Sequence, residues 1–256
     1  MKEYDLRNSA TQTNADRDYA NGMEELFPDS AGSVGDKLDN FARFVSRQSL
    51  SVFLAKNELM KMALPVHGSI VECGVFMGGG LFTWAQLSAI YEPVNHTRKV
   101  IGFDTFQGHA AISERDDAKG PGVSDEHKQE GSYKFSHLEE LKQSIRLFDL
   151  NRAIGHIEKV ELVPGDATVT IPRHIEDNPH LVVSLLYLDF DLFEPTRVAL
   201  ESLLPRMPKG AVIGFDELNQ KQWPGETLAV MEQVGLGKLK IRRFPYTPAL
   251  SYAIIE

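Results

Sequence analysis

Acidic side chains follow five apolar runs of this sequence, and carboxylates in such positions can bind cations, amines and hydroxyl groups. They are Glu72, Asp104, Asp166, Asp189, Asp191, Asp216 and Glu217. Carboxylates that lie close together repel one another unless a cation lies between them or some are protonated. In open α/β sheets, ligands bind beyond the carboxyl ends of the strands. We therefore expect these acids to converge on one rim of a sheet.

The glycine turn in "VECGVFMGGG" indicates which kind of ligand the first acid would meet. A dinucleotide site needs the spacing G-x-G-x-x-G, which lets the backbone approach a pyrophosphate. Here the spacing is G-x-x-x-G from Gly74 to Gly78, and Glu72 precedes the first glycine by two residues. An acid so close would repel a pyrophosphate. It suits a ligand with an ammonium group, such as the amino-acid end of S-adenosylmethionine.

Two further acids suit the remaining parts of that ligand. Asp104 could accept hydrogen bonds from two ribose hydroxyls, with Phe106 as a wall, and Asp166 could accept one from the adenine amino group. The predicted cofactor site therefore consists of Glu72, Gly74, Gly78, Gly79, Asp104, Thr105, Phe106, Asp166, Ala167 and Asp189.

A second site is predicted from the acids that follow the last two of the five runs. Asp189 lies after one run, and Asp216 and Glu217 lie after the next. Oxygen ligands of this kind suit Mg²⁺ or Ca²⁺, with water and substrate oxygens completing the coordination. Alternatively, Glu217 points to solvent and Asp216 caps the following loop.

The elements that must position these residues form an alternating pattern. Strand-like runs cover residues 68–74, 99–106, 159–167, 181–191 and 210–218, and helical patterns cover 37–64, 81–92, 136–150 and 195–207. This alternation predicts βαβ units and a mostly parallel sheet with helices on both faces. Residues 238–244 and 249–256 look like a terminal antiparallel hairpin, which gives an α/β fold with a seven-stranded sheet.

Two segments lie outside this pattern. Residues 1–35 are polar and are expected to form a loosely ordered arm, with at most a short helix around Glu24–Phe27, before a single domain at 36–256. Residues 107–132 are too long and polar for an ordinary connection. Their position after a strand predicts a lid insertion rather than a floppy loop.

Composition excludes several classes of function. The net charge of −9 and the pI near 5.4 argue against a nucleic-acid surface. The one cysteine, Cys73, cannot form an intramolecular disulfide and is expected to be a small buried hydrophobe. The first thirty residues lack the apolar segment of a signal peptide, and no apolar run is long enough to cross a bilayer. A cytoplasmic protein without a membrane partner is expected.

From about Phe44 onward the chain resembles the macrocin O-methyltransferase family. The matching stretches are "IVECGVFMGGG", "GFDTFQG", "LLYLDFDLFEPTRVALESLLPRMPKGAVIGFDELN" and "PGE". The resemblance implies a Rossmann-like class I methyltransferase fold, a dimer, and S-adenosylmethionine- and Mg²⁺-dependent methylation of sugar hydroxyls in natural products. It also implies that Asp189, Asp216 and Glu217 bind the metal and that Asp191 is the general base.

The chain departs from the family pattern in two places. Glu217 stands where the family usually has a second aspartate, and Asp166 and Ala167 stand where it often has an aromatic pair. The first departure predicts an altered metal geometry, and the second weakens any expectation of how adenine stacks.

The spacing of Asp189 and Asp191 predicts a division of labour. Residues two apart on a strand point the same way and lie about 6–7 Å apart, which is too far to share one cation easily. Asp189 would hold the metal and Asp191 would take the proton. Rival bases are the histidines in or beside the predicted lid, His109, His127 and His137, and Trp223, Pro224 and Gly225 could form one wall of the acceptor site.

Other interpretations of the sequence stay open. The acceptor could be a catechol-like diol or another non-sugar alcohol. The chain could instead be a nucleoside-binding partner protein that has lost catalysis, although such a protein has no reason to retain mutually repelling acids. A nicotinamide oxidoreductase is opposed by the glycine spacing.

Overall fold

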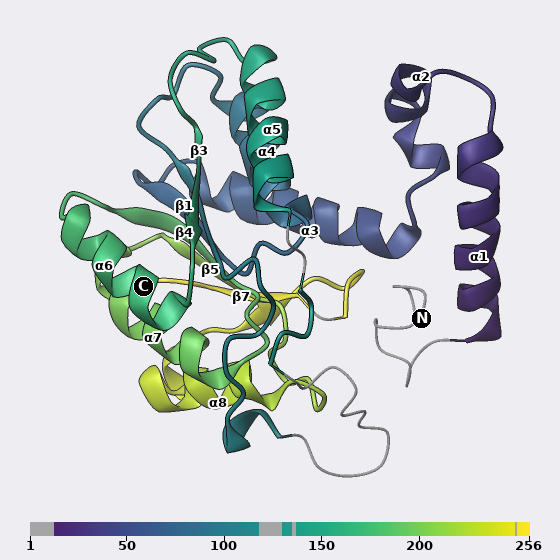
Figure 1. Cartoon of the computed structure of the whole chain (residues 1–256). Coiled ribbons are helices and arrows are strands. Elements are labelled where there is room, and N and C mark those ends of the chain that lie inside the picture. The colour runs from purple at the N-terminus through teal and green to yellow at the C-terminus, as the bar shows by residue number, and fades with distance from the viewer. Residues whose placement is uncertain (1–12, 118–129, 135–136, 249) are drawn as a thin grey trace.

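The computed structural model describes residues 13–117, 130–134, 137–248 and 250–256 (Figure 1). Its described residues form a seven-stranded sheet in the order β3-β2-β1-β4-β5-β7-β6. The strands are β1 (Ser69–Cys73), β2 (Val100–Asp104), β3 (Val160–Pro164), β4 (Val183–Leu188), β5 (Val212–Phe215), β6 (Arg242–Arg243) and β7 (Ser251–Ile254). Strands β1 to β5 pair in parallel, whereas β7 is antiparallel to β5 and β6. The predicted sheet and its terminal hairpin are confirmed.

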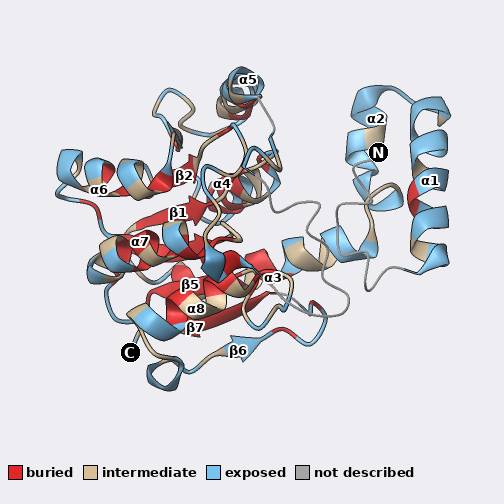
Figure 2. Cartoon of the chain, turned by 60° about the horizontal axis from the view of Figure 1, so that its bottom comes forward, coloured by how far each residue is buried: buried red, intermediate tan, exposed pale blue. Residues whose placement is uncertain are grey.

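Helices cover both faces of the sheet, as predicted. One face packs against α3 (Arg47–Ala63), α4 (Gly79–Tyr91) and α5 (Leu138–Leu150), and the other against α6 (Ala167–Asp177), α7 (Phe193–Leu203) and α8 (Pro224–Gln233). The buried residues gather in these two layers and in the strands between them (Figure 2). Short 3-10 helices are η2 (Phe41–Arg43), η3 (Glu114–Asp116), η4 (Leu204–Arg206) and η5 (Leu236–Lys238). The sequence patterns did not predict α6 and α8.

Several strands end earlier than the apolar runs predict. The expected strand at 159–167 ends at Pro164, because Gly165 turns the chain with φ +130° and Asp166 caps α6. The expected strand at 181–191 is β4 and ends at Leu188. Asp191 has φ +63°, in the left-handed region that no strand residue adopts. This early end determines where the acids after β4 point.

The amino-terminal segment is more helical than its polar composition suggests. Helices α1 (Asn14–Asp29) and α2 (Val34–Asp39) extend beside the sheet domain (Figure 1). Each begins with a capping box, Thr13 with Asp16 and Ser33 with Asp36. The prediction of only a short helix at Glu24–Phe27 is therefore wrong, while residues 1–12 of the predicted arm lie outside the described residues.

Side chains on the central strands alternate between the two helical layers. On β1, Ile70 packs in the α3–α4 layer, whereas Val71 and Cys73 pack in the α6–α7 layer. Cys73 is fully buried, as expected of a small apolar residue. Glu72 has the same parity as Ile70 and therefore points toward α3 and α4. Among the described helices, none combines the length and the apolar character needed to cross a bilayer.

Candidate active site

The carboxyl ends of the parallel strands bring the predicted acids to one rim. Backbone hydrogen bonds continue one residue past the strands, from Asp189 N to Cys73 O at 2.8 Å and from Asp216 N to Leu188 O at 3.1 Å. Gly74 has φ +100°, and a Cβ there would lie 1.9 Å from the carbonyl oxygen of Asp189. Only glycine allows the β1 turn to lie this close to the first acid after β4.

Asp104 holds the glycine turn in place. Its Oδ2 accepts hydrogen bonds from the amides of Val75 and Phe76, both at 2.8 Å, and its Oδ1 accepts one from Phe106 at 2.6 Å. Charge-assisted bonds of this kind are about twice as strong as neutral ones. Gly78, with φ +86°, then begins α4 as its N-cap, followed by Gly79. Asp104 thus lies at the predicted cofactor site while fixing the loop that would surround the cofactor.

The other predicted cofactor residues lie on the same rim. Thr105 donates a hydrogen bond to the carbonyl of Gly108 at 2.5 Å, and Phe106 is buried with φ +53°. Asp166 Oδ1 accepts bonds from the amide and hydroxyl of Thr168, at 2.9 and 2.8 Å, and the neighbouring Ala167 is buried. The structure brings these residues together, and their roles toward a cofactor stay predictions.

Glu72 has a different environment from the one expected of a ligand-binding acid. Its Oε1 accepts hydrogen bonds from Lys56 Nζ at 2.9 Å and from Trp84 Nε1 at 3.1 Å, and Glu72 is 1% exposed. The ammonium beside Glu72 therefore belongs to the chain itself. This placement follows from the strand parity, which turns Glu72 into the α3–α4 layer. Glu72 Oε2 is buried, and no hydrogen-bond partner for it lies among the described residues, so contact with a cofactor ammonium stays a prediction.

Lys56 is itself buried and carries its charge beneath the acidic rim. Its Nζ lies 4.0 Å from the ring centroid of Tyr187 and 5.2 Å from that of Trp84. Burial acts to lower the pKa of Lys56, but attraction to Glu72 and Asp189 outweighs it and leaves the pKa raised. Lys56 could not be recognised from the sequence, because a lysine on a helical pattern gives no signal of burial.

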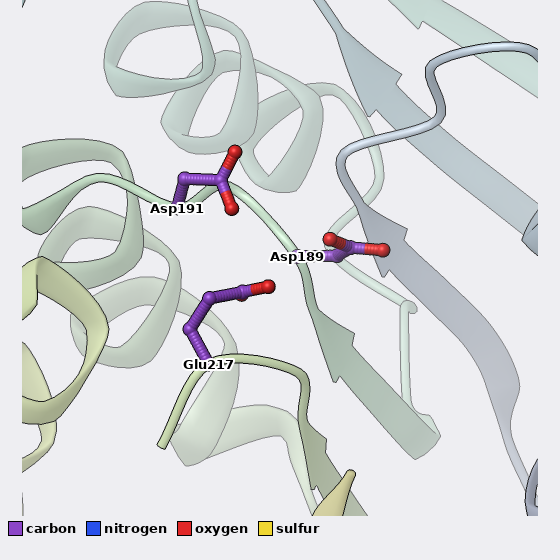
Figure 3. Close-up of side chains that lie close together, drawn as sticks. All are labelled: Asp189, Asp191 and Glu217. Carbon is purple, nitrogen blue, oxygen red and sulfur yellow. The ribbon is translucent and has the colours of Figure 1, made fainter. Parts of the chain in front are cut away.

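Asp189, Asp191 and Glu217 form the group that could hold a metal ion (Figure 3). One carboxylate oxygen from each lies within 4.8 Å of the others. The separation predicted for Asp189 and Asp191 assumed that the strand continued, whereas β4 ends at Leu188 and the left-handed turn at Asp191 directs its carboxylate back toward Asp189. The spacing argument that the two cannot easily share a cation therefore does not apply, because its premise of a continuing strand is wrong.

Asp216, the third predicted metal ligand, lies outside this group. Its Oδ1 accepts a hydrogen bond from the hydroxyl of Tyr187, which binds it from the α3–α4 side of the sheet. Glu217, one residue later, points to Asp189 and Asp191 instead. The three-carboxylate group therefore contains Asp191 and not Asp216, and the role of Asp216 as a metal ligand stays a prediction.

The electrostatics of this group favour a cation. Burial raises the pKa of Asp189 and of Glu217 well above the usual range, and the charge of Asp216 raises both further. Glu217 Oε2 is buried, and no hydrogen-bond partner for it lies among the described residues. Oxygen donors with these properties fit Mg²⁺, which would compensate their charge and the unpaired oxygen.

Aromatic residues enclose Asp191 on its outer side. His109 Nε2 lies 3.4 Å from Asp191 Oδ2, and only 10% of the His109 side chain is exposed. The His109 ring contacts those of Tyr133 and Trp223, with centroids 5.3 and 5.6 Å away. Of the other histidines considered as bases, His127 lies outside the described residues. His137 pairs with Glu140 on α5 at 3.2 Å.

Glu226, the acid of the motif "PGE", is a further residue of the site that was not predicted from the sequence. It is fully buried, and its Oε1 accepts a hydrogen bond from the amide of Glu217 at 3.1 Å. This bond fixes the backbone from which the Glu217 carboxylate extends. The sequence signal that could have identified Glu226 is its position directly after Pro-Gly at the start of a helix.

Comparisons with known proteins show which proteins this chain is similar to. Residues 47–232 match the family model described as Macrocin-O-methyltransferase (TylF). Demethyldecarbamoylnovobiocin O-methyltransferase of Streptomyces niveus is 28% identical over 152 residues, which are 59% of this chain and 53% of that protein. The chain therefore matches about half the length of this curated relative.

Two solved structures are similar over nearly the whole chain. The crystal structure of CalS11, a calicheamicin methyltransferase, has a TM-score of 0.89 and 31% identity, and covers 95% of this chain and 93% of that one. The apo structure of CalS11, described as a TDP-rhamnose 3'-O-methyltransferase of calicheamicin biosynthesis, has a TM-score of 0.81, 31% identity and 95% coverage of both chains.

Proposed function

This chain belongs to the macrocin O-methyltransferase family, and we propose that it transfers a methyl group from S-adenosylmethionine to a hydroxyl of a sugar or another small-molecule natural product. The observation that carries the proposal is the group of Asp189, Asp191 and Glu217 beside the glycine turn. Its similarity to a TDP-rhamnose 3'-O-methyltransferase and to demethyldecarbamoylnovobiocin O-methyltransferase supports a deoxysugar as the acceptor class.

The cofactor would lie along the rim from β1 to β3. The turn from Gly74 to Gly79 would receive its methionine end, Asp104 the ribose, and Asp166 with Ala167 the adenine. Asp104 binds two backbone amides of this turn and one of the loop after β2, and a preformed loop lowers the entropy lost on binding. Glu72 Oε1 accepts a hydrogen bond from Lys56, while Oε2, which has no partner among the described residues, could receive the cofactor ammonium.

Asp189, Asp191 and Glu217 would hold the divalent cation, preferably Mg²⁺. When bound, such a cation polarises the acceptor hydroxyl and makes its proton easier to remove. Asp216 stays beside the group without joining it and adds to the negative potential there. Glu226 fixes the backbone of Glu217.

Methyl transfer from a sulfonium is an in-line displacement, so the main task of the chain is to align two reactants. The carbon–sulfur bond breaks as the carbon–oxygen bond forms, and the proton of the acceptor hydroxyl passes to Asp191. His109 orients the Asp191 carboxylate through Nε2. Trp223 and Tyr133 offer ring faces that can pack on a sugar and exclude water from the reacting oxygen.

Calorimetry with S-adenosylmethionine, in the presence and absence of Mg²⁺, tests the proposal. We expect the purified protein to bind S-adenosylmethionine, and Mg²⁺ to bind in a one-to-one ratio that the Glu217→Gln variant weakens. An acceptor screen should then start from nucleotide-linked and glycoside-linked deoxysugars and include catechols. Absence of cofactor binding would overturn the proposal. Turnover that continues in the presence of EDTA would contradict the metal dependence that the proposal contains.

Two finer expectations stay predictions. A dimer is what the family resemblance implies, and sedimentation equilibrium would measure it. A cytoplasmic location is the expectation drawn from the sequence, and cell fractionation would test it.

A further inference from the structure

Asp116 is a buried acid within the segment 107–117, which follows β2 and leads away from the rim. It is 1% exposed, although most of the surrounding residues are polar and accessible. Its Oδ2 accepts hydrogen bonds from the amide and hydroxyl of Ser113, at 2.8 and 2.7 Å, and closes the η3 turn. Its Oδ1 accepts a bond from the amide of Phe193 at 2.6 Å.

The bond to Phe193 caps helix α7 from a distant part of the chain. The N-cap residue of α7 is Leu192, whose side chain can make no capping bond. Asp116 therefore supplies an acceptor and a negative charge to the first turn of α7, where both are stabilising. Phe193 comes two residues after Asp191, so this cap also fixes the turn that directs the Asp191 carboxylate.

Helix α8 leaves space for the Asp116 side chain because its second residue is a glycine. Gly225 is the second residue of α8, and a Cβ there would lie 2.3 Å from Asp116 Oδ1 and 2.5 Å from Phe193 N. Arg115 adds an ion pair with Glu232 of α8 and lies 4.3 Å from the Phe193 ring centroid. The η3 turn lies beside α8 in Figure 1. Three separate features thus attach one point of the segment to α7 and α8.

The start of the segment, at His109, is attached separately, close to Asp191. His109 N donates to Ser132 O at 3.0 Å, and Gly131 N donates to His109 O at 2.9 Å. At this attachment the His109 side chain places Nε2 3.4 Å from Asp191 Oδ2. The His109 backbone is thus held by Ser132 and Gly131, and the chain that continues from it is held again at Asp116.

We propose that Asp116 is a positioning residue that fastens residues 107–117 to α7 and α8 and thereby keeps His109 beside Asp191. The proposal rests on the proposed function only in its kinetic consequence. The fastening itself is a property of the folded chain and can be measured without a cofactor or an acceptor.

The first test is hydrogen exchange of the Asp116→Ala variant. Loss of charge-assisted bonds should raise amide exchange of residues 107–117 and of Phe193 by about 10- to 100-fold, with β1 and β4 unchanged. Asp116→Asn can present its amide oxygen to only one of the two donor groups and should fall between the wild type and Asp116→Ala. Glu114→Ala removes an exposed acid from the same turn and serves as the matched control.

Tryptophan fluorescence gives an independent readout. The chain has two tryptophans, and Trp84 is fully buried in the core while Trp223 contacts His109. Acrylamide should quench Trp223 more readily in Asp116→Ala, with Trp84 as the unquenched reference, and Trp223→Phe should abolish the difference. Equal exchange and equal quenching in Asp116→Ala, Glu114→Ala and the wild type would overturn the proposal, whatever the result with S-adenosylmethionine.

The kinetic consequence is a rise in the acceptor KM. If residues 107–117 are attached to α7 and α8, that is closed, for a smaller fraction of the time, the apparent affinity for the acceptor falls by that fraction. Asp116→Ala should therefore raise the acceptor KM by about tenfold. Its kcat should stay within about twofold, because a bound acceptor favours the closed segment. A fall in kcat with an unchanged KM would contradict the positioning role even if exchange and quenching behave as expected.

Discussion

The Asp191→Asn variant is expected to fold normally and to lose kcat by about 10²–10⁴-fold, the usual contribution of a positioned general base. Asparagine has nearly the same shape as aspartate but cannot take the acceptor proton. The left-handed backbone at position 191, φ +63°, tolerates asparagine as well as it tolerates aspartate. Steady-state release of S-adenosylhomocysteine with a screened acceptor measures the loss, and thermal unfolding checks the fold.

The same substitution should also weaken Mg²⁺ binding, because Asp191 lies in the three-carboxylate group. A magnesium titration separates the two effects. If Asp191 serves as the base, kcat at saturating Mg²⁺ stays low. If Asp191 serves only as a metal ligand, raising the Mg²⁺ concentration restores kcat. Asp189→Asn provides the comparison, since its activity should recover with Mg²⁺ to a greater extent.

Two further variants give the controls for this experiment. Asp177→Asn changes an exposed acid at the end of α6 in the same way and should leave kcat unchanged. His109→Gln tests the rival base beside Asp191. If His109→Gln loses more kcat than Asp191→Asn at saturating Mg²⁺, the proton passes to His109 and the assignment of Asp191 is wrong.

The rim of acids could be predicted from sequence because it depends on local patterns. An apolar run that ends in an acid marks a strand end, and the parallel topology places all such ends on one edge. Asp104, Asp166 and Asp189 reach that edge without any knowledge of tertiary packing. The fold class follows from the same alternation of strands and helices.

The composition of the metal group could not be predicted in the same way. It depends on the residue at which β4 ends, and the apolar run continues past that point. The presence of Asp191 in this group follows from one left-handed residue, and the position of Asp216 outside the group follows from the Tyr187 hydroxyl bound to it. Asp116 is separated from its partner Phe193 by 77 positions, so sequence spacing gives no signal of that contact.

The buried pair of Lys56 and Glu72 carries the largest expected effect on stability. Lys56→Met should lower the free energy of unfolding by about 3–5 kcal/mol, because it leaves the Glu72 carboxylate buried without its cation. Both side chains are at least nine-tenths buried, so solvent screening does not reduce the effect. Denaturant unfolding in EDTA at pH 8 measures it, with an unchanged m-value as the check on two-state behaviour.

The loss in Lys56→Met should depend on pH. Burial raises the pKa of Glu72, and attraction to Lys56 opposes this, so removing Lys56 raises the pKa further. When the pKa of a group is higher in the folded state than in the unfolded state, the free energy of unfolding falls as pH rises above the unfolded-state pKa. The deficit relative to the wild type should therefore be smaller near pH 5 than at pH 8, because Glu72 can be neutral at the lower pH.

The double variant Lys56→Met, Glu72→Gln shows whether the charge or the packing causes this loss. Replacing both members of a buried pair is often nearly neutral, and a glutamine at position 72 needs no cation while its amide oxygen can still accept from Trp84. The double variant should thus recover most of the stability and lose the pH dependence. Lys61→Met, on the exposed side of α3, should cost less than about 1 kcal/mol. A double variant as unstable as Lys56→Met alone would mean that the lysine stem, and not its charge, supports the core beneath the site.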